Sequence, residues 1–118
     1  MDAIELTPEH PVPQLREWAE TAEAEGFDTA FVSHHYNNRD EFVALAEMAR
    51  ATDRIRLGPG VVNPAETHPV TLASRMAPLD ELAGGRGVLG VRPGDAAPLS
   101  NLALDPEGPL RLGWGLLE

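Results

Sequence analysis

A dense group of polar side chains follows an apolar stretch near the start of the chain. The letters SHHYNNRD occupy residues 33–40, directly after DTAFV at residues 28–32. Side chains of these types could bind a metal ion, form a surface turn, or line the rim of a catalytic barrel. A zinc site on His34, His35 and Asp40 is the least favoured interpretation, because adjacent histidines on an extended segment point in opposite directions.

Two further polar stretches contain glycine. PGVVNPAETH covers residues 59–68, and RPGDAA covers residues 92–97. The phosphate-binding motif G-x-x-x-x-G-K-[ST] is excluded because the chain contains no lysine. The dinucleotide motif G-x-G-x-x-G is missing after the first predicted strand, where the chain reads TPEHP. The polar stretches therefore match neither of the common nucleotide-binding loops.

Composition limits the class of protein. The chain has 118 residues, of which 42% are hydrophobic, and is therefore long enough for one domain with a core. It has no cysteine, which excludes disulfides, thiolate metal sites and cysteine nucleophiles. No apolar run approaches the roughly 20 residues of a membrane span, and the amino terminus lacks the features of a signal peptide. We therefore expect a cytoplasmic protein without a membrane partner.

The charge is strongly negative. Nineteen acidic residues face nine basic ones, all of them arginine, and the formal net charge is -10. A charge of this sign disfavours nucleic acid and anionic membranes as partners. It suits a halophilic protein, because concentrated salt screens the self-repulsion. A GC-rich genome explains the absence of lysine equally well, and both interpretations stay open.

Hydrophobic periodicity predicts that strands and helices alternate. Apolar residues recur at the three- and four-residue spacing that is typical of a helix buried on one face. Asp40 is the expected N-cap of the second helix. Pro78 falls inside the third helix, where we expect it to bend the helix or to cost about 3 kcal/mol. The expected strands cover residues 2–6, 28–33, 54–62 and 87–91, and the expected helices cover residues 11–26, 39–52 and 68–85.

This alternation is typical of a parallel α/β fold, in which right-handed crossovers place the helices outside the sheet. We expect four parallel strands in the order 1-2-3-4, with the three helices on one side. The polar stretches lie at the carboxyl ends of these strands, where parallel α/β folds bind their ligands. The regular alternation favours a (β/α)8 barrel, although a complete barrel takes roughly 250 residues.

Several motifs carry a family resemblance. In this order, GFDTAFVSHHYNNRD, LGPGVVNP, HPVTLASRMAPLDELAGGRGVLGV and PGD resemble the amino-terminal part of the luciferase-like flavin and deazaflavin oxidoreductases. Within that superfamily the chain is most similar to the methylenetetrahydromethanopterin reductases, which use the deazaflavin coenzyme F420. The resemblance implies the amino-terminal half of a (β/α)8 TIM barrel. The expected partial domain covers residues 1–109, and a diverged or truncated tail covers residues 110–118.

The resemblance also implies a reaction. The family transfers a hydride between the reduced deazaflavin and a methylene-tetrahydropterin, of methanopterin or folate type. Glu5 matches a catalytic acid that faces the pterin, where a carboxylate could hold the substrate or stabilise its cationic iminium. A solvated acid at a strand end is the alternative interpretation. His35 matches a histidine close to the deazaflavin, and its imidazole could hydrogen-bond the polar edge of the ring.

The remaining residues assigned by resemblance bind the cofactor. They are Gly60, Val61, Asn63, Gly94 and Asp95. The family has a non-proline cis peptide that falls by position at Gly60-Val61 and forms a bulge behind the cofactor ring. An ordinary glycine bulge is the alternative interpretation. No metal is implied.

Two residues depart from the pattern of the family. His34 replaces the usual aspartate, which leaves the role of that carboxylate unfilled. Arg92 stands where glycine is expected, so its side chain either blocks the pocket or turns outwards. Asn37, Asn38 and Arg39 could serve only to build a turn and to cap the next helix.

The departures keep two alternatives open. One is a truncated, non-catalytic half-barrel that self-associates through its unpaired strand edges. The other is an FMN-dependent luciferase-like monooxygenase. With either alternative, or with the reductase, we expect a homo-oligomer.

Overall fold

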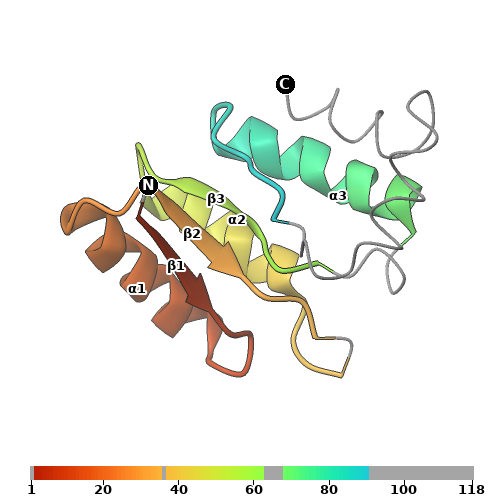
Figure 1. Ribbon diagram of the computed structural model, residues 1–118, viewed down its shortest axis with the longest axis horizontal. Coiled ribbons are helices and arrows are strands. Elements are labelled where there is room, and N and C mark those ends of the chain that lie inside the picture. The colour runs from red at the N-terminus through yellow and green to blue at the C-terminus, as the bar shows by residue number, and fades with distance from the viewer. Residues whose placement is uncertain (1, 36, 63–67, 91–118) are drawn as a thin grey trace.

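A computed structural model of the chain describes residues 2–35, 37–62 and 68–90 (Figure 1). Strands and helices alternate along this part of the chain, as the periodicity predicts. They are β1 (Ala3–Leu6), α1 (Val12–Ala24), β2 (Thr29–Val32), α2 (Glu41–Ala51), β3 (Arg56–Pro59) and α3 (Pro69–Leu82). Each strand is shorter than expected: polar residues at the ends of β1 and β2 belong to the connecting loops, and β3 ends at Pro59, directly before the cis peptide Gly60-Val61.

The three strands form one parallel sheet in the order β1-β2-β3. Alternate side chains of a strand face opposite sides of a sheet, and Ile4, Ala30 and Leu57 share one register on the side that faces the helices. Leu6 and Val32 follow on the same side and are buried in the core. Residues from all three helices pack into this core, which confirms the expected placement of the helices on one side (Figure 1).

The expected fourth strand requires a correction. The described residues contain three strands, and Gly87 joins β3 through an isolated parallel bridge to Leu57. The segment 86–90 still runs beside β3, because Val88 N donates to Leu57 O at 3.0 Å and Gly90 N donates to Pro59 O at 2.9 Å. The order along the sheet is therefore as expected, but the pairing is too short within the described residues to form a regular strand.

Local signals explain where the helices begin and end. Asp40 caps α2 as predicted, and its Oδ1 accepts a hydrogen bond from Phe42 N at 2.8 Å. His68 caps α3 in the same way, with Nδ1 accepting from Val70 N at 3.1 Å. α3 continues through Pro78 as a single helix. It ends before Gly84, which has the positive φ that favours glycine.

Arg86 connects the ends of two helices to β3. Its guanidinium donates to five acceptors at 2.6–3.0 Å. Four of them lie more than thirty residues away in the sequence, at the end of α2 and just before β3, and the fifth lies three residues away, at the end of α3. The acceptors are Ala83 O, Thr52 Oγ1, Thr52 O, Ile55 O and Ala49 O. Carbonyls at a helix carboxyl end lack partners within the helix and carry partial negative charge. Arg86 therefore supplies both the hydrogen bonds and the positive charge that these ends require.

Glu23, near the end of α1, holds the loop between α2 and β3 in place through hydrogen bonds. Its Oε2 accepts hydrogen bonds from the backbone N–H groups of Asp53, Arg54 and Ile55 at 2.9, 2.6 and 2.9 Å. Partial burial opposes ionisation of this carboxyl, but the three hydrogen bonds and the nearby Arg54 outweigh it and lower the pKa of Glu23 below its usual value. The ionised form of Glu23 therefore stabilises the fold.

We expect this stabilisation to depend on pH in a defined direction. A carboxyl whose pKa is lowered in the folded state stabilises the protein above its unfolded pKa, and the contribution disappears as the pH falls through the folded pKa. Unfolding free energy measured by urea denaturation should thus fall more steeply with acidification in the wild type than in Glu23→Gln. Glu17 is an exposed acid on the same helix, and Glu17→Gln should keep the wild-type slope. Equal slopes for all three proteins would contradict this role of Glu23.

Among the described residues, no helix is both long and apolar enough to cross a membrane.

Candidate functional site

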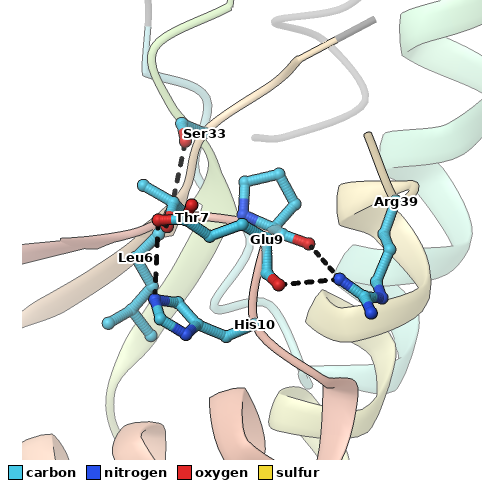
Figure 2. Close-up of polar contacts among 7 residues, drawn as sticks. Leu6, Thr7, Glu9, His10, Ser33 and Arg39 are labelled. Carbon is cyan, nitrogen blue, oxygen red and sulfur yellow. Dashed lines mark hydrogen bonds and ion pairs between the residues drawn. The ribbon is translucent and has the colours of Figure 1, made fainter. Parts of the chain in front are cut away.

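The carboxyl ends of the three strands are joined by hydrogen bonds into one rim. Ser33 N donates to Leu6 O at 2.9 Å, and Ser33 Oγ contacts the same oxygen at 3.4 Å (Figure 2). Gly60 N donates to Val32 O at 3.0 Å and continues the ladder to β3. The polar stretch that follows β2 therefore lies between the ends of β1 and β3, which confirms its predicted place on the rim.

Arg39 makes a connection that sequence analysis missed. Its Nη1 donates to Glu9 O at 2.7 Å and to Pro8 O at 3.4 Å, so the loop after β2 is fastened to the loop after β1 (Figure 2). Asn38 builds the expected turn, because its N donates to His35 O at 3.0 Å. No local pattern could reveal the reach of Arg39, since its acceptors are backbone carbonyls about thirty residues away.

Phe31, Gly60 and Gly90 form a surface beside the rim, on the side of the sheet that the Phe31 side chain faces. We call this the inner surface. A Cβ atom on Gly60 would stand 2.6 Å from Phe31 Cδ1, and one on Gly90 would stand 2.9 Å from Phe31 Cε1. The phenyl ring therefore packs directly against backbone that carries no side chain. The peptide Gly60-Val61 at this point is cis, which confirms the expectation from the family resemblance.

Besides Gly60 and Val61, two more of the expected site residues lie in the part of the chain that the structure describes, Glu5 and His35. Glu5 pairs in register with Phe31, and Phe31 pairs with Gly58, so their side-chain positions face the same open side of the sheet. Glu5 is exposed there, and His35 is exposed on the rim. The other expected cofactor residues and the departure at position 92 lie outside the described residues. They are Asn63, Gly94, Asp95 and Arg92.

The zinc interpretation finds no support in the described part of the chain. His34 Nδ1 lies 2.7 Å from Glu41 Oε2, and Asp40 is occupied as a helix cap. No group of three or more potential metal ligands is found among residues 2–35, 37–62 and 68–90.

The pair formed by His34 and Glu41 is the second contact that sequence analysis missed. The two side chains are 13% and 5% exposed, so both are largely buried. Glu41 is the first residue of α2, a position that favours an acid because of the helix dipole. The helix dipole explains an acid at this position but does not predict a partner in the loop that follows β2.

This arrangement defines a class of protein. It is a segment of parallel α/β barrel with its candidate ligand site at the carboxyl ends of the strands. The family model of the luciferase-like monooxygenases matches residues 2–112, and the chain belongs to this family.

Individual relatives give a finer comparison. A 5,10-methylenetetrahydromethanopterin reductase of Methanolobus tindarius is 39% identical over 107 residues, which make up 91% of this chain and 33% of that protein. The solved structure of the coenzyme F420 dependent tetrahydromethanopterin reductase of Methanopyrus kandleri superposes with a TM-score of 0.74 at 37% identity, over 86% of this chain and 29% of that one. A 4-hydroxyprotoasukamycin monooxygenase of Streptomyces nodosus subsp. asukaensis is 37% identical over 86% of this chain and 31% of its own length. This chain therefore spans about a third of the length of the relatives it matches.

Proposed function

We propose that this chain carries part of the active site of an F420-dependent oxidoreductase that acts on a methylene-tetrahydropterin. The observation that supports this most is the inner surface of Phe31, Gly60 and Gly90, combined with the similarity to the two reductases. The Phe31 ring covers the backbone of Gly60 and Gly90, so the three residues form one apolar face against which a flat ring system could pack. The bound deazaflavin would supply the hydride donor and acceptor, and the pterin, of methanopterin or folate type, would be its partner in the reaction.

The residues of this chain receive separate roles in the proposal. Gly60 and Val61 back the cofactor ring, and His35 hydrogen-bonds its polar edge. Glu5, on the open face of β1, holds the pterin and stabilises the positive charge of its iminium form. Asn63, Gly94 and Asp95 are assigned to the cofactor on the family resemblance alone.

A titration with two cofactors tests this proposal. Fluorescence of coenzyme F420 should change saturably when the 118-residue chain is added, and FMN at the same concentration should bind more weakly. We expect the affinity for the deazaflavin to be low, because the chain spans only about a third of its relatives. Preferential binding of FMN would instead support the luciferase-like monooxygenase, and binding of neither cofactor would contradict the proposal.

The role of Glu5 leads to a prediction about the reaction. Glu5→Gln keeps the shape of the side chain but removes the charge that would stabilise the iminium. The rate of hydride transfer in single-turnover absorbance measurements should fall about a hundredfold, the usual loss for a group that stabilises charge in a transition state. Binding of the deazaflavin should be unchanged, since Glu5 faces the pterin. Glu17→Gln provides the matched control, and an unchanged rate in Glu5→Gln would show that Glu5 is only a solvated acid.

A second candidate function is self-association without catalysis. β1 is the edge of the described sheet, and an apolar groove of about 350 Å³ lies between it and α1. Ile4, Leu6, Trp18 and Phe27 line this groove. We propose that a second copy of the chain covers the groove, and that salt favours the dimer by screening the net charge of -10. Light scattering across a salt series tests this, and a monomer at every salt concentration would contradict it.

The cellular location belongs to the same proposal. We place the protein in the cytoplasm, on the absence of cysteine and the acidic composition.

A further inference from the structure

Two buried ionisable side chains meet where the chain leaves β2. His34 Nδ1 and Glu41 Oε2 are 2.7 Å apart, and their side chains are 13% and 5% exposed. His34 follows directly on Ser33 at the end of β2, while Glu41 begins α2. The contact therefore spans the rim turn and connects its two ends.

The contact between His34 and Glu41 is a hydrogen bond that fixes one nitrogen of the imidazole ring. At 2.7 Å the two atoms share one proton in a hydrogen bond, whichever of them carries it, and this bond engages Nδ1 of the His34 ring. One fixed nitrogen, together with the buried carboxylate, fixes the orientation of the His34 ring. An apolar pair of similar volume would often be as stable as a buried polar pair of this kind. What the hydrogen-bonded pair adds is a specific geometry.

The orientation of His34 constrains the two residues next to it in the chain, Ser33 and His35. Successive side chains of an extended segment point to opposite sides, so anchoring His34 toward α2 directs Ser33 and His35 to the other side. Ser33 is already fastened to Leu6 O on β1, and His35 O accepts the hydrogen bond from Asn38 N. His35 is thus held from both sides while its own side chain stays exposed on the rim.

We propose that His34 and Glu41 are a positioning pair that holds His35 in the orientation in which its imidazole meets the deazaflavin. This inference rests on the proposed function. Neither residue of the pair is assigned a contact with the reacting atoms, and both act through His35.

Three variants distinguish a role of the pair in positioning His35 from a role only in stabilising the fold. The double variant His34→Leu/Glu41→Leu removes the hydrogen-bonded pair but keeps an apolar contact, so the fold should be retained. His34→Asn places an amide N–H donor where Nδ1 stands and should rescue the geometry. Arg16→Leu/Glu47→Leu removes a half-buried contact of 3.5 Å between α1 and α2 and is the matched control away from the rim.

The first readout needs no cofactor. In 15N NMR spectra of the chain, the double leucine variant should show shifted amides of His35 and Asn38 and a lower heteronuclear NOE at both, because the rim turn loses one anchor. His34→Asn and the control should keep the wild-type values. Wild-type amides and NOE values in the double leucine variant would overturn the inference.

The second readout is binding of coenzyme F420, followed by shift titration. The double leucine variant should bind about tenfold more weakly, because His35 would no longer be held where its imidazole meets the cofactor. His34→Asn should recover most of the affinity. Equal binding by the wild type and the double leucine variant would show that the pair is only structural. A wild type that binds no F420 would instead overturn the proposed function, and the first readout would still decide whether the pair positions His35.

Discussion

Replacement of Arg86 by methionine is expected to lower the free energy of unfolding by about 4 kcal/mol, because buried or partly buried acceptors lose a charged donor. Methionine keeps most of the length and apolar volume of the side chain. The five hydrogen bonds of the guanidinium disappear, and Ala49 O, Thr52 O and Ile55 O lose their bonds to it. Small domains are stable by roughly 5–15 kcal/mol, so this one substitution removes a large part of the total.

Urea denaturation followed by circular dichroism measures this effect. Arg50→Met is the matched control, since Arg50 is exposed on the last turn of α2 and loses only a surface charge near a helix end. That loss should be below about 1 kcal/mol. If Arg86→Met were no less stable than Arg50→Met, the carbonyls of α2 would find other partners, and the connecting role of Arg86 would be wrong.

Gly58→Ala is expected to separate the segment 86–90 from β3. A Cβ atom at Gly58 would stand 1.5 Å from Val88 O and 2.6 Å from Val88 C, and a backbone carbonyl cannot move aside as a side chain can. The segment must therefore shift away, and its hydrogen bonds to Leu57 and Pro59 break. We expect a loss of about 3 kcal/mol, at the upper end of the usual cost of overpacking.

Hydrogen exchange localises this effect. Val88 N and Gly90 N should exchange much faster in Gly58→Ala, whereas the amides of β1 and β2 should keep their protection. Gly87→Ala is the matched control, because a Cβ there meets the side chain of Asp80, at 2.7 Å, which can rotate. Its effect should be clearly smaller. Unchanged exchange at Val88 in Gly58→Ala would contradict the close approach of the two segments.

The alternation of strands and helices could be predicted from the sequence because each element carries its own local signal. The apolar spacing around Leu15 and Leu45 marks helix faces, and Asp40 marks the start of α2 at the residue that caps it. The polar stretch from Ser33 could be placed on the rim because carboxyl ends of parallel strands share one edge. These predictions depend on short-range physics, which a sequence displays directly.

The contacts that fasten the fold together could not be predicted in this way. Glu23, Arg39 and Arg86 act on backbone groups that lie about thirty or more residues away, and a backbone acceptor leaves no mark in the sequence. The fourth strand was overestimated for the opposite reason: apolar residues and glycine indicate a strand, but they do not show how far the pairing continues.

We propose that a deazaflavin binds at the rim formed by the carboxyl ends of β1, β2 and β3. An NMR shift titration of the 118-residue chain with coenzyme F420 tests it most directly, because it detects weak binding and locates it. We expect saturable shifts at the amides of Phe31, His35, Gly60 and Gly90, with smaller shifts for FMN at equal concentration. Shifts confined to the groove between β1 and α1, or no shifts at all, would contradict it.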